Sequence, residues 1–278
     1  MASQLKKKRV AVIATGWVGD TIACSAAATS LSEAGCQVTF FTRWPQLKEI
    51  LQNDVRFKVR VYWHLKIIKW LKPFLNLWFD QVVWEPSRWG YREPFTSEIR
   101  RLAGCAPHPE YELFLSPGTR NTHQHHKSLP IIAVGRDLYK RAYGRNVDEF
   151  MVMLSEGAQI LWVGLDPHKN SKHGKNQSLL KQAKKIASCD LFIGPEGGLL
   201  WLAAGIGIPC LYFTENIVEV AKQNHLSSLD HVLGSQNHFP RQLKYRAFEP
   251  YCSNQMALEL VRLTLNHIQK SSESNSCI

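Results

Sequence analysis

Long apolar runs and closely paired cysteines are both missing from this 278-residue chain. No stretch of about 18 or more uncharged apolar residues occurs, so the sequence predicts no transmembrane helix. No apolar signal-peptide core follows the basic residues near the N-terminus. The seven cysteines form no Cys-x-x-Cys pair, and most stand among apolar residues. They are typical of reduced thiols in the core of a cytoplasmic protein, not of disulfides or a zinc site.

Acidic residues are also fewer than basic ones. The chain has 23 Asp+Glu against 34 Lys+Arg, a formal net charge of +11 and a pI near 9.4. The excess is concentrated, because residues 120–185 hold 12 Lys+Arg and five Asp+Glu, and residues 6–9 add four more basic side chains. This charge predicts an anionic partner, which is a nucleic acid, an acidic membrane surface or a phosphorylated small molecule.

The order of expected elements indicates the fold class. An apolar strand over 9–14, a small-residue helix over 21–34 and a second strand over 36–42 form a β-α-β unit, which favours parallel strands. A second alternating series starts at residue 130, after a stretch rich in proline and polar residues. The sequence therefore predicts an α/β protein of two Rossmann-like domains facing a cleft, with domains at 1–125 and 126–278.

A glycine turn in the second series is a candidate ligand site. An apolar strand at 189–193 leads through Gly197 and Gly198 into a small-residue helix. The backbone N–H groups of Gly198, Leu199 and Leu200 would be unpaired at the helix N-terminus, where the helix dipole favours a phosphate or diphosphate. An ordinary strand-turn-helix connection explains the glycines equally well.

Asp20 is the candidate acid–base residue. It follows the first strand through Gly16-Trp-Val-Gly19, and α/β sheets bind their ligands at the carboxyl ends of their strands. A carboxylate there can accept a proton from a hydroxyl group. The alternative is that Asp20 only caps a helix that begins at Thr21.

Together the two stretches resemble glycosyltransferase family 9, the heptosyltransferase-like enzymes of GT-B fold. The family has an early Gly-Asp loop, matched by Gly19-Asp20. It also has a C-terminal pattern of acid, glycine turn, Ala-Ala helix and proline-led strand, matched by residues 190–209. The resemblance covers residues 9–43 and 130–270. It implies transfer of a sugar from a nucleotide-sugar donor to a hydroxyl acceptor, with inversion and without a metal.

The resemblance also implies roles for individual residues. Asp20 matches the catalytic base, and the 198–200 amides match the turn that binds the donor diphosphate. Lys140, followed by Tyr143, matches a lysine that stabilises the leaving diphosphate, although a solvated basic face is the alternative. Asp166 is placed near the donor ribose.

Three positions depart from the family pattern. Glu196 stands where the family has Asp, Gly197 where it has Ser or Thr, and Trp201 where it has His. All three lie in the expected donor site. Trp201 could stack on a base or a sugar, or it could pack in the core.

No metal site or cofactor is predicted. The chain has no Asp-x-Asp triplet, which metal-dependent GT-A enzymes use, and no Gly-x-Ser-x-Gly, Walker or His-Glu-x-x-His motif. The histidine cluster at 123–126 lacks a neighbouring acid or cysteine, so a solvated linker is favoured over a metal site or an acceptor-side role.

Residues 64–79 interleave lysines with tryptophan and other apolar side chains, and Pro73 interrupts any single helix. One interpretation is an element that docks the acceptor or a membrane surface. The other, slightly favoured, is an amphipathic core helix with a basic outer face.

The acceptor is the open question. The family resemblance implies a cell-envelope glycan or glycolipid at a membrane surface, with the protein in the cytoplasm or at the inner face of the membrane. The charge keeps a phage-type, DNA-modifying glycosyltransferase as an alternative. A non-catalytic protein that binds nucleotide-sugars is a third. The sequence assigns no nucleotide, sugar or oligomeric state.

Overall fold

The structure is a computed structural model that describes residues 8–51, 57–85, 101–104, 129–140, 146–164, 178–195, 197–213, 245–248 and 253–275. These residues fall into two compact units, one ending at residue 104 and the other beginning at residue 129. Each unit is an α/β layer structure, which confirms the predicted fold class. The predicted boundary between residues 125 and 126 lies outside the described residues and stays a prediction.

The sheet of the first unit has four parallel strands in the order β3-β2-β1-β4. The strand order therefore reverses between β1 and β4. Its strands are β1 (Arg9–Ile13), β2 (Gln37–Thr42), β3 (Lys58–Val61) and β4 (Gln81–Trp84). All four fall within strands that the sequence predicts, at 9–14, 36–42, 57–63 and 81–84, because short β-branched and aromatic runs between turn residues are a clear strand signal.

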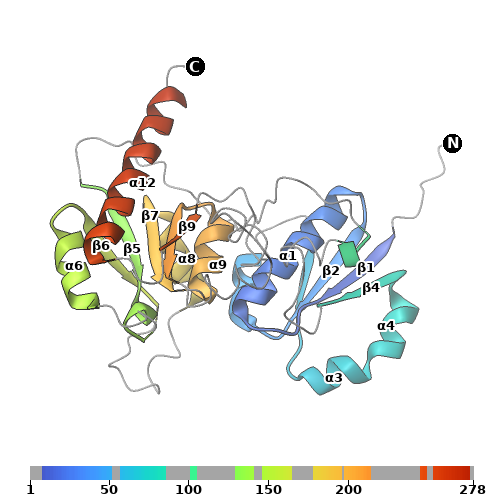
Figure 1. The fold of residues 1–278 in the computed structure, drawn as a ribbon. Helices are drawn as coiled ribbons and strands as arrows, with labels where there is room; N and C mark the ends of the chain where they lie inside the picture. Colours follow the sequence, from blue (N-terminus) through green and yellow to red (C-terminus); the bar gives the residue numbers. More distant parts are fainter. Residues whose placement is uncertain are drawn as a thin grey trace, which may run out of the picture. The chain divides into compact units, whose positions relative to one another are not determined.

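Helices cover both faces of this sheet (Figure 1). On one face lies α1 (Val18–Glu33). The opposite face is covered by α3 (Leu65–Trp70) and α4 (Lys72–Trp78), which bury one aliphatic side chain each, Ile68 and Leu75, against Ile13 and Tyr62. Pro73 lies in the first turn of α4 and, as predicted, separates two short helices. The unit also contains α2 (Pro45–Leu51).

The sheet of the second unit has five parallel strands in the order β6-β5-β7-β8-β9. Its strand order reverses between β5 and β7. Its strands are β5 (Ile131–Gly135), β6 (Gln159–Val163), β7 (Leu191–Pro195), β8 (Cys210–Phe213) and β9 (Tyr245–Phe248). The sequence did not predict β9, because Tyr-Arg-Ala-Phe is short and its pairing with β8 is set by tertiary structure.

Helices pack on both faces of this sheet (Figure 1). On one face, α6 (Val147–Ser155) and α12 (Asn254–Asn275) share an apolar core with β5, β7 and β8. The other face is covered by α8 (Leu179–Ala187) and α9 (Gly198–Ile206). Arg136–Lys140 forms a 3-10 turn, η1, directly after β5.

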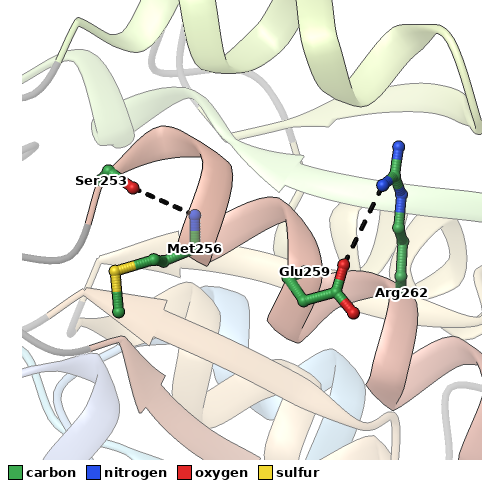
Figure 2. A network of polar contacts seen from close by, with 4 residues as sticks. All are labelled: Ser253, Met256, Glu259 and Arg262. Atoms are coloured by element: carbon green, nitrogen blue, oxygen red, sulfur yellow. Dashed lines mark hydrogen bonds and ion pairs between the residues drawn. The ribbon is translucent and has the colours of Figure 1, made fainter.

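The long C-terminal helix α12 is held by its apolar side. Ala257, Leu258 and Val261 are buried in the core of the second unit. Figure 2 shows the polar contacts at its start, where the Met256 N–H donates to Ser253 Oγ at 3.2 Å and Arg262 pairs with Glu259 at 3.9 Å. The ion pair is exposed, and such pairs add little to stability.

The described cysteines fit the prediction of core thiols. Cys24, Cys189 and Cys210 are buried and unpaired, and Cys36 is half-buried. In the described part of the chain, none of the helices combines the length and the apolar character needed to cross a bilayer.

Candidate functional site

Two acidic residues mark the point where the strand order of the first sheet reverses. Ligands of open α/β sheets bind at the carboxyl ends of the strands at such a point. Beyond the end of β1 come Gly16 and, in the first turn of α1, Asp20. Directly after β4 comes Glu85, whose backbone N–H donates to the carbonyl of Ile13 in β1 at 2.9 Å. Asp20 and Glu85 therefore both follow the carboxyl ends of neighbouring strands, β1 and β4, at the same edge of the sheet.

Glu85 binds the loop that follows β1. Its Oε2 accepts the backbone N–H of Thr15 in a very short hydrogen bond and that of Gly16 at 2.7 Å. A carboxylate that accepts two backbone donors holds a loop firmly, since charge-assisted hydrogen bonds are stronger than neutral ones. Glu85 thereby fixes the backbone of the segment that leads to Asp20.

Asp20 lies in the third position of α1, not before the helix. Its Oδ2 accepts the backbone N–H of Trp17 at 2.9 Å, and Trp17 is the N-cap residue. The capping alternative therefore holds in a changed register. The helix begins at Val18 and not at Thr21, and Asp20 is not the N-cap residue but accepts the N–H of that residue in a capping box. Within the described residues, the second oxygen of Asp20, Oδ1, accepts no hydrogen bond.

Glycine is required at position 16 because the side chains of Asp20 and Glu85 both lie close to its backbone. A β-carbon built on Gly16 would overlap the carboxylate of Glu85 and lie 2.6 Å from Oδ2 of Asp20. Both acidic groups therefore border the same side of the Gly16 backbone. Two carboxylates this close favour retention of a proton by at least one of them.

A cation packed against two neighbouring indoles completes this group, since the ring centres of Trp17 and Trp44 are 6.2 Å apart. The guanidinium of Arg43, the first residue after β2, lies 5.4 Å from the ring centre of Trp17 and 4.8 Å from that of Trp44. Arg43 Nε and Trp44 Nε1 both donate to the carbonyl of Gly16, at 3.1 and 2.9 Å. The Trp17 side chain is 70% exposed, so an apolar ring faces solvent beside the acidic pair.

Burial and charge set the ionisation of the two acids. Burial raises the pKa of Asp20, against the lowering effects of the Trp17 N–H and the Arg43 charge. Burial also raises the pKa of Glu85, and the charge of Asp20 adds to this, while its backbone hydrogen bonds and Arg43 oppose it. Both groups are stronger bases than ordinary carboxylates.

Two further side chains, Tyr62 and Cys24, lie near the loop that follows β1. The Tyr62 hydroxyl donates to the carbonyl of Ala14 at 2.7 Å, and burial is the main cause that raises its pKa to about 12. Burial and then the charges of Glu85 and Asp20 raise the pKa of the Cys24 thiol far above its usual value. Cys24 is therefore a neutral packing group and not a nucleophile.

The second unit has its own site at a strand-order reversal, between β5 and β7. The helix α9 begins at Gly198 directly after β7, and its N-cap is Gly197, which has no side chain to pair with the first N–H groups. Gly198, Leu199 and Leu200 are thus the first three residues of the helix, one residue earlier than predicted. Their N–H groups form the helix N-terminus, the arrangement that favours an anion.

Three chain segments meet at this helix start. Gly164, which follows β6, has a left-handed φ of +95°, and a β-carbon there would lie 2.9 Å from Leu199 and 3.8 Å from the backbone nitrogen of Arg136. Gly135 and Gly194 lie near the ends of β5 and β7. A β-carbon would lie 2.7 Å from Asp137 Oδ1 at Gly135 and 2.8 Å from the Phe192 ring at Gly194, so side chains already fill the space that a β-carbon would need.

The structure describes the other residues predicted for the donor site only in part. Trp201 is 5% exposed and lies within the α9 packing layer, as the packing alternative expects. Lys140 ends η1 after β5, and its side chain lies outside the described residues. Glu196 and Asp166 also lie outside the described residues, as does the histidine cluster at 123–126. Among the residues that the structure describes, no three His, Cys, Asp or Glu side chains gather as a metal site.

Sequence reasoning missed Glu85, Arg43 and Trp44. Arg43 and Glu85 immediately follow predicted strands, and Trp44 comes one residue after Arg43. This is a usable signal, because strand carboxyl ends carry the functional residues of α/β sheets. The signal becomes specific only when the strand order is known, since β4 is next to β1 although about 70 residues separate them.

No protein-family model matches this sequence, and no curated protein sequence does so either. Similarity appears at the level of the fold. A glycosyl transferase family 9 protein from Veillonella parvula superposes with a TM-score of 0.69 at 11% identity, over 96% of this chain and 99% of the other. ADP-heptose LPS heptosyltransferase II of E. coli gives 0.62 at 12% identity, over 94% and 99%.

A third similar structure is the dodecameric, iron-containing heptosyltransferase TibC of E. coli, in complex with ADP-D-β-D-heptose. It gives a TM-score of 0.55 at 13% identity over 76% of this chain, and this chain spans 59% of the TibC chain. At these identities the similarity establishes the fold, which is that of GT-B glycosyltransferases.

Proposed function

We propose that this protein is a glycosyltransferase that moves a sugar, of hexosyl or heptosyl type, from a nucleotide-sugar donor to a hydroxyl acceptor. The observation that carries the proposal is the pairing of Asp20 and Glu85 around Gly16, at the strand-order reversal of a GT-B fold. A buried acidic pair with raised pKa values suits proton removal from a hydroxyl group.

In this proposal Asp20 is the catalytic base and Glu85 is a positioning residue. The acceptor oxygen attacks the anomeric carbon while its proton passes to Asp20 Oδ1. The bond between the anomeric carbon and the diphosphate oxygen breaks, and its electron pair leaves with the nucleoside diphosphate. A direct displacement of this kind inverts the anomeric configuration. Glu85 is already occupied by the two backbone donors and holds the loop.

The donor side of the proposal uses the second unit. The N–H groups of Gly198, Leu199 and Leu200 bind the diphosphate, and Lys140 neutralises charge as it leaves. In other transferases a metal ion neutralises the charge of the leaving diphosphate. Here the amides and Lys140 have that role, so we propose that no metal is required. Fold neighbours bound to ADP and to ADP-heptose make adenine nucleotides the first donors to test.

For the acceptor we propose a cell-envelope glycan or glycolipid, presented to the protein at the cytoplasmic face of the membrane. The exposed ring of Trp17 beside Asp20 supports a sugar acceptor, since pyranose rings pack on indole faces. The net charge of +11 favours a second candidate, a DNA-modifying transferase that acts on hydroxylated bases. The departures at Glu196 and Trp201 favour a third, a non-catalytic protein that binds nucleotide-sugars.

A donor screen tests the proposal. Thermal melting of the full chain with ADP, UDP, GDP, CMP and their sugars identifies the nucleotide, because a ligand that binds only the folded state raises Tm. NMR of the product from the matching sugar donor then gives the anomeric configuration. Transfer that persists in EDTA and inverts the anomeric centre is expected. If no nucleotide raises Tm and no donor is consumed, the proposal fails; binding without turnover supports the non-catalytic candidate.

A further inference from the structure

Six large apolar side chains of the first unit are exposed within one short segment, residues 63–78. The segment includes α3 and α4, which lie on the face of the sheet opposite α1 (Figure 1). Trp63 is 93% exposed, Leu77 74% and Trp70 72%. We call this surface the α3–α4 face; its apolar members are Trp63, Ile67, Trp70, Phe74, Leu77 and Trp78.

This exposure differs from the favoured sequence interpretation. An amphipathic core helix would bury its aromatic side chains and expose its lysines. Instead, one residue from each helix, Ile68 and Leu75, is buried, and the larger rings point away from the core. Trp70 of α3 and Phe74 of α4 lie with their ring centres 5.9 Å apart, so the apolar surface continues across the junction of the two helices.

All the charged side chains of α3 and α4 are lysines. Lys66, Lys69 and Lys72 are exposed, and residues 63–79 contain no Asp or Glu. Lys66 and Trp70 are four residues apart in α3 and so share the side of the helix that faces away from Ile68. The next acid along the chain, Asp80, is exposed but accepts the Arg9 backbone N–H at 2.7 Å.

We propose that the α3–α4 face binds the surface of a bilayer that contains anionic phospholipids. Tryptophan concentrates at the membrane–water interface, and lysines beside it bind lipid phosphates. Helices of six and seven residues can lie in that interface but are too short to cross the bilayer. This proposal concerns membrane binding and does not depend on the sugar-transfer reaction.

Charge argues against a second copy of the chain as the occupant. A two-fold interface places the same surface of both chains together, so the lysines of one copy would lie near those of the other. An anionic lipid surface instead neutralises them. The attachment of α3 and α4 through Ile68 and Leu75 to the core around Ile13 holds the face as part of the folded unit.

Vesicle flotation with the full chain tests this proposal. We expect binding to phosphatidylcholine vesicles with about 30 mol% phosphatidylglycerol, because anionic headgroups attract basic surfaces, and at least about tenfold weaker binding to pure phosphatidylcholine. Added salt should weaken the binding, because charge attraction is screened. Equal binding to both vesicle types, or to neither, overturns the proposal.

Two double variants separate the apolar and the charged contributions. Trp70→Ser with Leu77→Ser, and Lys66→Glu with Lys69→Glu, should each reduce binding to the anionic vesicles about tenfold or more. All four side chains are exposed, so melting temperatures should match that of the parent. The controls replace an exposed apolar pair by serine and an exposed lysine pair by glutamate in the second unit. They are Val152→Ser with Leu263→Ser, and Lys181→Glu with Lys184→Glu.

The controls should bind as the parent does. If they weaken binding as much as the α3–α4 variants, the face is not the membrane contact and the proposal is wrong. Sedimentation equilibrium tests the other occupant. If Trp70→Ser with Leu77→Ser converts an oligomer to a monomer and leaves vesicle binding unchanged, the face joins two copies and the proposal is overturned.

Discussion

Glu85 Oε2 accepts the backbone N–H of Gly16 at 2.7 Å, across 69 residues of sequence. This hydrogen bond joins the end of β4 to the loop that follows β1, where Asp20 lies. The acid that holds the loop and the acid proposed as the base are therefore different residues with different roles. Each role predicts its own response to mutation.

Asp20→Asn should greatly slow sugar transfer and leave the fold intact. The asparagine oxygen can still accept the Trp17 N–H, so the start of α1 keeps its cap. Loss of the base should lower kcat by about 100-fold or more. Steady-state kinetics with the donor found in the nucleotide screen measures this, and thermal melting checks the fold.

Asp80→Asn is the matched control. Asp80 also accepts a backbone N–H of the first sheet, that of Arg9 at 2.7 Å, but it precedes β4 and so lies at the other end of the sheet. Its amide variant should keep full turnover. Full turnover in Asp20→Asn would remove Asp20 from the role of base.

Glu85→Ala should destabilise the first unit, whereas Glu85→Gln should keep most of its stability. Alanine leaves the N–H groups of the half-buried residues Thr15 and Gly16 without their acceptor. A fully buried unpaired donor costs about 1–3 kcal/mol, and the cost for each of these is smaller because water can reach it. Glutamine retains one carbonyl acceptor. Urea unfolding measures both changes; equal stability of the alanine variant and the parent would show that Glu85 does not hold the loop.

Glu85→Gln should also change how stability depends on pH. A carboxyl group with a raised pKa binds more protons in the folded than in the unfolded state. Its contribution to the free energy of unfolding is complete below the unfolded pKa, near 4.3, and is lost as the pH rises through the folded pKa. This contribution should therefore fall over this range in the parent and be absent from the variant, so the stability of the parent relative to Glu85→Gln should decrease as the pH rises. A larger loss in the variant would contradict the raised pKa.

Arg43→Met should move the acid limb of the pH–rate profile. Burial raises the pKa of Asp20, so the protonated, inactive form should persist to higher pH than for an ordinary aspartate. Arg43 opposes this shift, and its removal should move the acid limb of kcat/KM further toward high pH. Lys48→Met, which removes an exposed charge from α2, is the control and should leave the limb in place. A shift toward low pH would exclude this role of Arg43.

Gly198→Pro should weaken donor binding without unfolding α9. Proline is tolerated at the first helical position, where its missing N–H has no partner within the helix. It removes one of the three amides proposed to bind the diphosphate. A hydrogen bond to a charged group contributes about 1.5–3 kcal/mol, so the Kd for nucleoside diphosphate should rise about tenfold or more.

Leu179→Pro places the same change at the first position of α8, which has no predicted ligand role. Isothermal titration should give this control the Kd of the parent. If both variants bind the nucleotide equally well, the N-terminus of α9 is not the diphosphate site.

Much of the fold could be predicted from the sequence because its signals are local. Strands such as Gln81–Trp84 are short apolar runs between turn residues, and the break at Pro73 follows from one residue. The start of α1 was placed three residues late, because the contact from Asp20 back to Trp17 is not visible in a pattern of residue types. β9 was missed for a similar reason, since β8 provides its hydrogen-bond partners.

The candidate site was predicted in part. Asp20 and the 198–200 turn were found because each follows a strand within the same β-α unit. Glu85 and Arg43 belong to other strands, and only the strand order β3-β2-β1-β4 brings them to Gly16. The exposure of Trp70 and Leu77 fits the less favoured of the two sequence interpretations, because composition alone does not tell which side of a short helix is buried.

Residues at the ends of three other strands hold the loop at Gly16, and this arrangement affects the order in which the unit folds. Arg43 after β2, Tyr62 after β3 and Glu85 after β4 all contact the loop between Ala14 and Gly16. Contacts over such sequence separations form late, since the chain entropy of closing the loops must be lost first. Helical structure should therefore recover early during refolding, and the geometry of the acidic pair should appear only when all four strands have assembled.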